Sequence, residues 1–328
     1  MTSKEIVMRT LEFTGPERLA RTLPEPWGSD IAGCGPKTDD LQTSWEKVTD
    51  DRWERRDVWG NTWARIDGHS KGEVARGALG NIHDVDDLSV PPLGDPQRYD
   101  QAAEKVQEKS DLFVRGSLPG FTFNVARKIR RLDQYMIDLH LHREQIEALH
   151  DRIDEVLVSM IEQYGRIGCD GVGFAEDWGT QVGLMIAPDM WREVFKPRFR
   201  RLCDVARQHG LRVLMHSCGK VTDIIPDLIE VGIDALLFDQ QKVHGLDNLA
   251  RYAGQVTYMC PVDIQDVLQT GDEAQIRAWA RQLVDRLWCG GKGGFIADYY
   301  GDNESIGADP QWQAWAADEF IKAGRRED

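Results

Sequence analysis

Residues 211–238 read LRVLMHSCGKVTDIIPDLIEVGIDALLF and contain a complete strand–helix–strand pattern. Leu211–His216 and Asp234–Phe238 are short, mostly apolar runs, which are typical of buried parallel strands. Between them, Thr222–Val231 has helical spacing and is followed by Gly232, a residue type that commonly ends helices. This unit predicts a parallel sheet whose strands are joined by right-handed crossover helices.

The same alternation continues on both sides of this unit. Further strands are expected at Leu112–Gly116, Gly171–Ala175, Val256–Cys260 and Gly294–Ala297. Further helices are expected at His142–Gly165, Asp189–His209, Leu246–Tyr252, Glu273–Leu287 and Gln311–Lys322. No GxGxxG or GxxxxGK[ST] motif follows any of these strands, which disfavours a nucleotide-binding, doubly wound sheet. The pattern therefore predicts an α/β fold, a (β/α)8 TIM barrel.

The 328-residue chain has the length of one barrel domain. Within residues 1–328, we expect regular β/α units over 111–328 and an irregular N-terminal extension over 1–110, which is rich in Pro, Gly and Trp. The elements expected in the extension are a helix at Ser3–Phe13 capped by Ser3, strands or a hairpin at Asp57–Ile66, and a helix at Gln97–Lys109 opened by Pro96.

The overall charge excludes several classes of partner. Asp and Glu number 55 against 40 Lys and Arg, a net charge of −15, which disfavours nucleic acid and anionic membranes. No apolar stretch approaches the roughly 20 residues of a membrane span, and the N-terminus lacks the apolar core of a signal peptide. The six cysteines include no CxxC, so no disulfide framework is expected. We therefore expect a cytoplasmic protein.

Titratable and metal-capable side chains follow five successive predicted strands. In a parallel barrel the active site lies at the C-terminal ends of the strands. In chain order these residues are Glu176, Asp177 and Trp178; His216 and Cys218; Asp239, Gln240 and Gln241; Cys260, Asp263 and Gln265; and Asp298, Tyr299 and Tyr300.

His216 and Cys218 are the strongest metal-ligand candidates. They lie two residues apart on extended chain, so their side chains leave on the same face. Imidazole and thiolate are ligands that zinc favours, although a His and a Cys that never meet a metal remain the alternative. Cys260 is a candidate third ligand and Asp298 a fourth; for Cys260 the alternative is a packed thiol.

Other residues near the strand ends receive catalytic or substrate-binding roles. Glu176 and Asp177 are candidates for general base or ligand, and the alternative is a pair that complements a helix dipole. Tyr299 is a third catalytic candidate. The substrate-binding candidates are Trp178, Gln181, Asp239, Gln241 and Asp263.

Gly168–Gln241, which includes HSCGKVTDIIPDL, resembles the uroporphyrinogen decarboxylase superfamily. The resemblance extends through Met259–Gly271 and GGFIADYYGDN (293–303), and back to Asp95–Tyr99 and the aromatic segment that begins at Asp57. It implies a TIM barrel and one of two activities. One is cofactor-free decarboxylation of the acetate arms of a tetrapyrrole. The other is methyl transfer to or from a corrinoid protein, with zinc held by an HxC pair and a later cysteine.

The chain departs from both patterns. In the methyltransferase branch the resemblance assigns zinc to His216 and Cys218, but Asp298, Tyr299 and Tyr300 stand where the later cysteine is expected. The decarboxylases carry an arginine-rich stretch ending in L-P-E, and Arg18–Glu25 matches it only loosely, with a different arginine spacing. The resemblance is therefore closer to the corrinoid-linked methyltransferases.

We expect a zinc-dependent methyltransferase that moves a methyl group from a small methoxylated or N-methylated substrate to a corrinoid, on a partner protein. Zinc with fewer thiolates is more electrophilic, which suits an ether or amine better than a thiol. Glu176 or Asp177 would manage the proton. The alternatives are a tetrapyrrole decarboxylase, in which Arg18 and Arg21 pair with carboxylates, and a non-catalytic barrel that binds a tetrapyrrole or corrinoid. A homodimer is left open.

Overall fold

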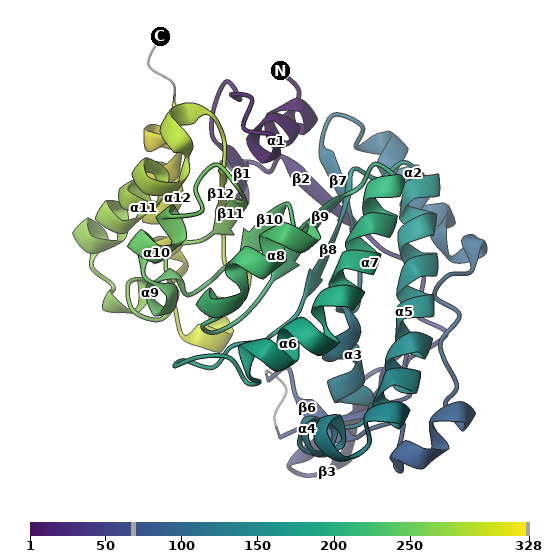
Figure 1. The fold of residues 1–328 in the computed structure, drawn as a ribbon. Coiled ribbons are helices and arrows are strands. Elements are labelled where there is room, and N and C mark those ends of the chain that lie inside the picture. Colours follow the sequence, from purple (N-terminus) through teal and green to yellow (C-terminus); the bar gives the residue numbers. More distant parts are fainter. Residues whose placement is uncertain (67–69, 326–328) are drawn as a thin grey trace.

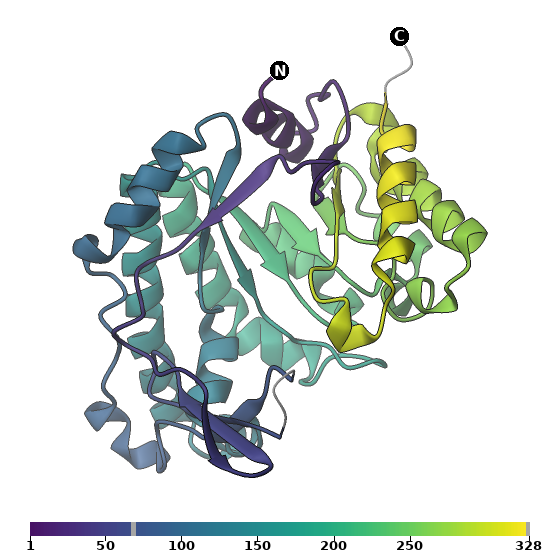
Figure 2. The ribbon, with the colours of Figure 1, turned by 180° about the vertical axis from the view of Figure 1, so that it is seen from behind.

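The structure, a computed structural model, describes residues 1–66 and 70–325. Eight parallel strands form one sheet that curls into a nearly closed barrel (Figures 1 and 2). These strands are β1 (Ala20–Thr22), β2 (Ile31–Cys34), β7 (Phe113–Ser117), β8 (Gly171–Ala175), β9 (Arg212–His216), β10 (Ala235–Leu237), β11 (Thr257–Cys260) and β12 (Phe295–Asp298). Their order around the barrel is β1-β12-β11-β10-β9-β8-β7-β2, and a bridge between Thr22 and Ser29 lies at the seam. The predicted TIM barrel is confirmed.

Helices surround the barrel on its outer face (Figure 1). The α-helices are α1 (Ser3–Leu11), α2 (Asp100–Glu108), α3 (Thr122–Ile129), α4 (Leu132–Leu141), α5 (Arg143–Arg166), α6 (Pro188–Val194), α7 (Lys196–Gln208), α8 (Ile225–Val231), α9 (Gln241–His244), α10 (Leu246–Ala250), α11 (Glu273–Leu287) and α12 (Pro310–Ala323). Short 3-10 turns are η1 (Ile82–Asp87), η2 (Pro96–Tyr99), η3 (Thr222–Ile224), η4 (Leu268–Thr270), η5 (Cys289–Gly291) and η6 (Glu304–Ile306).

Two apolar cores hold the barrel together. The outer core lies between the strands and the helices. The inner core fills the barrel from within, and α1 contributes Ile6, Val7 and Leu11 to it. Because α1 carries this apolar stripe, it closes the N-terminal end of the barrel. Figures 1 and 2 show α1 at the end opposite the small second sheet.

That second sheet is antiparallel and comes from the N-terminal stretch. Its strands, in spatial order, are β3 (Glu46–Thr49), β4 (Arg52–Arg56), β5 (Thr62–Arg65) and β6 (Glu73–Arg76). On it, arginine side chains stack over tryptophans, as Arg55 does over Trp45 and Trp63. The predicted strand pattern around Asp57–Ile66 therefore corresponds to β5 and the turn before it.

Several local predictions need correction. The stretch expected to be one helix at Asp189–His209 is two helices, α6 and α7, because Pro197 opens a new helix after Phe195. Thr2, not Ser3, caps α1, in a capping box with Glu5. The expected helix at Gln97–Lys109 begins as the turn η2 and becomes α-helical at Asp100.

The sequence pattern also missed elements. Strands β1 and β2 belong to the barrel although they lie in the stretch described as irregular, and α3, α4 and α9 were not predicted. Each of the two strands has only three or four residues and contains an arginine or a glycine, so no apolar run marks it.

Within the described ranges, no helix combines the length and apolar character that crossing a lipid bilayer requires.

Candidate metal centre at the barrel mouth

The alternation of side chains along the strands determines which of them point into the barrel interior. On β9, β10 and β12, residues of the inner core lie two positions before His216, Asp239 and Asp298. Because strand side chains alternate with a period of two, these three residues point into the barrel at its C-terminal end. They form the polar layer above the inner core.

Asp177, His216 and Cys218 come together in this layer. Within the described part of the chain, they form the group whose metal-capable atoms all lie within 4.8 Å of one another. His216 Nε2 is 3.3 Å from Cys218 Sγ and 3.9 Å from Asp177 Oδ1. Ligand atoms around tetrahedral zinc lie about 3.3–3.8 Å apart, because the bonds are about 2.0–2.3 Å long. The His216–Cys218 distance falls in this range and the His216–Asp177 distance lies just above it, so the three side chains are close enough to share one ion.

The Asp177 carboxylate is held from two directions. The backbone N–H of Cys218 donates to its Oδ1 over 3.1 Å. The Arg127 guanidinium donates to its Oδ2 over 3.2 Å. Arg127 itself is oriented by the side chain of Asn124, so α3 fixes the direction of a residue that follows β8. Partners of this kind orient metal ligands.

Asp239 adds a further carboxylate beside His216. Its Oδ2 lies 3.9 Å from His216 Nε2. Burial raises the pKa of Asp239, and the positive charges of His216 and Lys71 oppose that shift. Burial, together with the charges of Asp177 and Asp239, raises the pKa of the Cys218 thiol to about 12. A cation placed among these groups would reverse this effect on the thiol.

The loops after β8 and β9 touch through glycines. A Cβ at Gly219, whose φ is +69°, would lie 2.3 Å from the carbonyl oxygen of Gly179. The backbone N–H of Lys220 donates to Thr180 O over 2.7 Å, next to this contact. Glycine is therefore required at both positions, and the loop that carries Cys218 is fixed against the loop that follows Asp177.

Glu176 does not enter the barrel, contrary to the catalytic role expected for it. The side chain is completely buried and accepts backbone hydrogen bonds from Phe121, Phe123 and Asn124 at 2.7, 2.9 and 3.1 Å. These donors form the free N-terminus of α3. Burial raises the pKa of Glu176 to about 8, against the effect of the backbone donors. Glu176 therefore positions α3. This agrees with the alternative considered in the sequence, an acidic residue that complements a helix dipole.

Trp178 is also part of the core and not a substrate contact. Its side chain has no exposed surface and stacks on Phe123 with ring centroids 4.0 Å apart. The rings of Phe195 and Trp191 pack edge-on against it. Trp178 has the same parity as Glu176 on the chain, so both face the helices.

Cys260 is not brought to the metal-capable group. Its side chain is completely buried in the outer core, whereas its neighbour Met259 lies in the inner core. Burial raises the pKa of this thiol well above its ordinary value. Cys260, the expected third ligand, therefore faces the helices, because side chains alternate along β11 and its neighbour Met259 is the one that points inward.

Gln241 and Asp263, expected to bind substrate, are buried and serve the loops instead. The Gln241 amide donates to Phe238 O and accepts from Trp279 Nε1 over 3.2 Å. Asp263 accepts backbone hydrogen bonds from Lys242 and from two residues of its own turn. Their polar groups are thus already used inside the protein.

Three of the other predicted residues lie on or near the rim. Gln181 is exposed and its side chain is linked to Gln240, which in turn donates to Gln265 over 2.6 Å. The Tyr299 hydroxyl accepts from the Asn303 amide over 3.1 Å. Asp298 accepts a hydrogen bond from the Thr22 hydroxyl.

Asp298 points into the barrel, as the inner-core position of Ile296 indicates, but it is not part of the metal-capable group found among the described residues. Burial raises the pKa of Asp298 to about 6. Of the four expected ligands, the structure thus groups His216 and Cys218, together with Asp177, and leaves Cys260 and Asp298 outside this group.

Two functional candidates were missed in the sequence, Arg127 and Arg115. Arg127 lies on α3, an unpredicted helix, so no pattern pointed to it. Arg115 could have been found, because it stands inside the apolar strand LFVRG with the same parity as Phe113, a residue of the inner core.

The arginines expected to bind tetrapyrrole carboxylates lie elsewhere. Arg18 precedes β1 and pairs through both Nη atoms with Asp30, which precedes β2. Both residues are thus at the N-terminal end of the parallel strands, opposite His216. Arg21 lies on β1 between the inward-facing positions Ala20 and Thr22, so it faces away from the barrel interior.

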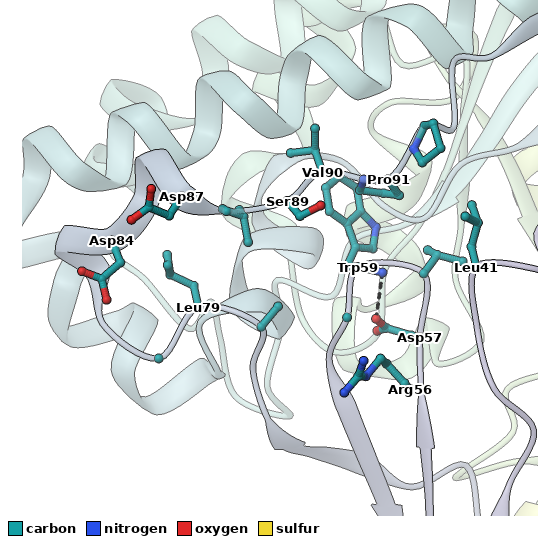
Figure 3. A pocket seen from close by; sticks show the side chains of 16 residues that line it. Leu41, Arg56, Asp57, Trp59, Leu79, Asp84, Asp87, Ser89, Val90 and Pro91 are labelled. Carbon is teal, nitrogen blue, oxygen red and sulfur yellow. Dashed lines mark hydrogen bonds between the residues drawn. The ribbon is translucent and has the colours of Figure 1, made fainter.

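A separate cavity of about 600 Å³ lies outside the barrel (Figure 3). Its lining includes Trp59, Val90, Pro91 and Asp84, and also Asp57, whose carboxylate accepts from Trp59 N over 2.9 Å. Of the described residues selected from the sequence for catalysis, metal or substrate, none lines it. The candidate functional residues thus lie at the barrel mouth and not in this cavity.

An α/β barrel with a group of metal-capable side chains at the C-terminal ends of its strands has the organisation of a barrel enzyme. Residues 82–299 match the family model described as uroporphyrinogen decarboxylase (URO-D). The chain belongs to this family. The comparison with curated proteins found no match.

Solved structures share the fold. A methyltransferase from Methanosarcina mazei aligns over 98% of this chain and 84% of its own, with a TM-score of 0.62 and 16% identity. A D-psicose 3-epimerase covers 74% of this chain and 88% of its own, with a TM-score of 0.44 and 9% identity. A xylanase from Gloeophyllum trabeum covers 69% and 80%, with a TM-score of 0.43 and 11% identity. At these identities the first likeness concerns the fold alone, and the other two add nothing to it.

Proposed function

We propose that the protein is a zinc-dependent methyltransferase, which transfers a methyl group from a small methoxylated or N-methylated compound to a corrinoid. The observation that carries the proposal is the grouping of Asp177, His216 and Cys218 at the barrel mouth. Family membership and the fold shared with a methyltransferase support it. The corrinoid would be presented by a partner protein, and the barrel would act as a monomer or homodimer.

The donor set fits zinc. His216 Nε2, Cys218 Sγ and Asp177 Oδ1 offer one nitrogen, one sulfur and one oxygen ligand, which leaves a fourth position for substrate. When bound, zinc would supply a Lewis acid that polarises the heteroatom carrying the methyl group. With a single thiolate the ion stays electrophilic, so an ether oxygen or an amine suits the site better than a thiol.

The protein's own residues would orient the ligands and move the proton. Arg127 and the backbone N–H of Cys218 hold Asp177 in position. Asp298 points into the same barrel interior and, with a pKa of about 6, can carry a proton. In this proposal the carboxyl group of Asp298 gives its proton to the heteroatom that loses the methyl group, a role that the sequence had assigned to Glu176 or Asp177.

The second candidate is decarboxylation of a tetrapyrrole, which the description of the matching family favours. A cofactor-free decarboxylase needs cationic groups that hold several carboxylates. Here Arg18 is engaged with Asp30 at the other end of the barrel, and three carboxylates, Asp177, Asp239 and Asp298, stand at the mouth. These observations rank decarboxylation second. A non-catalytic barrel that binds tetrapyrrole or corrinoid ranks third.

One screen distinguishes the three candidates. Methyl ethers and methylamines are mixed with the protein and cob(I)alamin, and methylcobalamin is followed by its spectrum, while porphyrinogen decarboxylation is assayed alongside. We expect cobalt methylation and no carbon dioxide release. Carbon dioxide release without cobalt methylation would overturn the proposal in favour of the decarboxylase. Binding without either reaction would favour the non-catalytic barrel.

A further inference from the structure

Arg115 takes no part in the reaction proposed above, and it lies inside the barrel. It stands on β7 two residues after Phe113, an inner-core residue, so its side chain points inward. Its backbone pairs with Gly171 of β8, but its side chain reaches forward to Gly173, which pairs with Leu214, two residues before the pairing of Ala175 with His216. Two strand residues span about 6.6 Å. The Arg115 side chain therefore crosses the barrel one layer below the candidate metal centre.

Gly173 makes room for this arginine. A Cβ at Gly173 would lie 2.4 Å from Arg115 Cδ and 2.7 Å from its Nε. These distances are far below van der Waals contact, so any larger side chain at position 173 would displace the guanidinium. The position of the Arg115 side chain on β7 thus depends on glycine at position 173 of β8.

Among the residues that the structure describes, the guanidinium of Arg115 has no partner. Its Nε is buried without a hydrogen bond, and the group makes no hydrogen bond or ion pair with any residue in the described ranges. Its side chain keeps a partly exposed surface. Burying a cation without a partner is costly, so such a group is expected to receive an anion from outside.

The surroundings limit what this anion can be. The negative charge of Asp298 acts on Arg115 without reaching ion-pair distance. Asp239 and Asp177 lie in the layer above. A multiply charged group such as phosphate would be repelled by these carboxylates, whereas one carboxylate can form two parallel hydrogen bonds with a single guanidinium.

We propose that Arg115 binds a carboxylate of the substrate, so that the substrate is a small methylated carboxylic acid whose methyl-bearing heteroatom faces Asp177, His216 and Cys218. This inference rests on the proposed function for the identity of the reacting end. Because the guanidinium beside Gly173 and the candidate metal centre lie at different levels of the same barrel interior, one substrate can contact them with its two ends. Arg115 would thus select the substrate and set its orientation.

The test measures binding separately from reaction. Benzoate and 3-methoxybenzoate are titrated calorimetrically into the zinc-loaded wild-type protein and into the variants Arg115→Met and Gly173→Ala. The first variant removes the charge, and the second keeps the charge but displaces it. We expect each variant to bind both acids at least about 10-fold more weakly, the loss of a charge-assisted hydrogen bond. Arg56→Met, at an exposed arginine, is the control and should bind like wild type. Circular dichroism checks that each variant is folded.

Failure of the inference and failure of the proposed function give different results. If neither acid binds, or if all variants bind them equally, the role of Arg115 is refuted, even when neutral methoxybenzene methylates cob(I)alamin. Equally tight competition by inorganic phosphate would refute the single-carboxylate class. If the acids bind in an Arg115-dependent way but no compound methylates cobalt, the carboxylate site stands and the proposed reaction fails.

Discussion

Asp177 uses its two carboxylate oxygens differently. Oδ2 is bound by Arg127, while Oδ1 receives the backbone N–H of Cys218 and faces His216 Nε2. Asp177 follows the end of β8, and His216 and Cys218 lie at the end of the neighbouring strand β9. Every second residue along such a strand points into the barrel. At the scale of single residues, the candidate metal centre follows from strand parity together with one arginine from a helix.

Replacing Cys218 by serine tests the ligand set. Substitutions of residues that only orient ligands already cost about 10–100-fold in metal affinity, so loss of the thiolate is expected to cost at least about 100-fold. Zinc content after dialysis, measured by mass spectrometry, reports the change. Cys289→Ser is the control, because Cys289 lies outside the metal-capable group. Stoichiometric zinc in both variants would show that Cys218 is not a ligand.

Asp298 predicts a pH dependence. Burial raises its pKa to about 6, so the carboxyl group is protonated below that pH and loses its proton above it. If the protonated form supplies the proton, turnover at saturating zinc falls about tenfold per pH unit above pH 6. Asp298→Asn should abolish this limb and lower turnover at acidic pH. A limb that persists unchanged in the asparagine variant would assign the titration to another group.

At the scale of elements, α3 links the helical layer to the mouth. Its N-terminus rests on Glu176, its third residue, Asn124, orients Arg127, and Arg127 binds Asp177. The two consecutive acidic residues after β8 thus serve opposite sides of the strand. Glu176 holds the N-terminus of α3 in place, and Arg127 of α3 donates a hydrogen bond to Asp177.

Replacing Glu176 by glutamine should therefore affect stability. An amide has one oxygen, so at least one of the three backbone N–H groups of α3 loses its acceptor. We expect a loss of about 1–3 kcal/mol in the free energy of unfolding, measured by denaturant titration. Glu155→Gln, at an exposed position, should change it little. An unchanged stability with a complete loss of turnover would instead return Glu176 to a catalytic role.

The sequence predicted the elements better than the site. The strands from Gly171 onward are continuous apolar runs, and their positions agree with the structure to within a residue or two. His216 and Cys218 were recognised because both lie on one strand end. Cys260 was selected for its place on the rim without regard to the alternation of side chains along β11, which turns it toward the helices. Arg127 could not be assigned because contacts between a helix and a distant loop leave no local pattern.

In the molecule as a whole, the apolar packing of α1 and the candidate functional side chains lie at opposite ends of the barrel. Helix α1 closes one end with apolar side chains, and carboxylates, an imidazole and a thiol collect at the other. The family and the fold were predictable because the β/α alternation runs through most of the chain and the HSCGKVTDIIPDL segment resembles the family closely. Strands β1 and β2 were not, because tertiary pairing holds them in the sheet and not their own apolar pattern.

Zinc dependence of methyl transfer tests the central claim most directly. Metal-free protein is titrated with zinc in the presence of cob(I)alamin and a methyl ether that is active in the screen, and methylcobalamin formation is recorded. We expect no reaction without metal and a rate that rises in proportion to zinc until about one ion per chain is bound, because the described residues hold one group of metal-capable side chains at the mouth. Full activity of the metal-free protein, or no response to zinc, would show that the reaction does not depend on zinc.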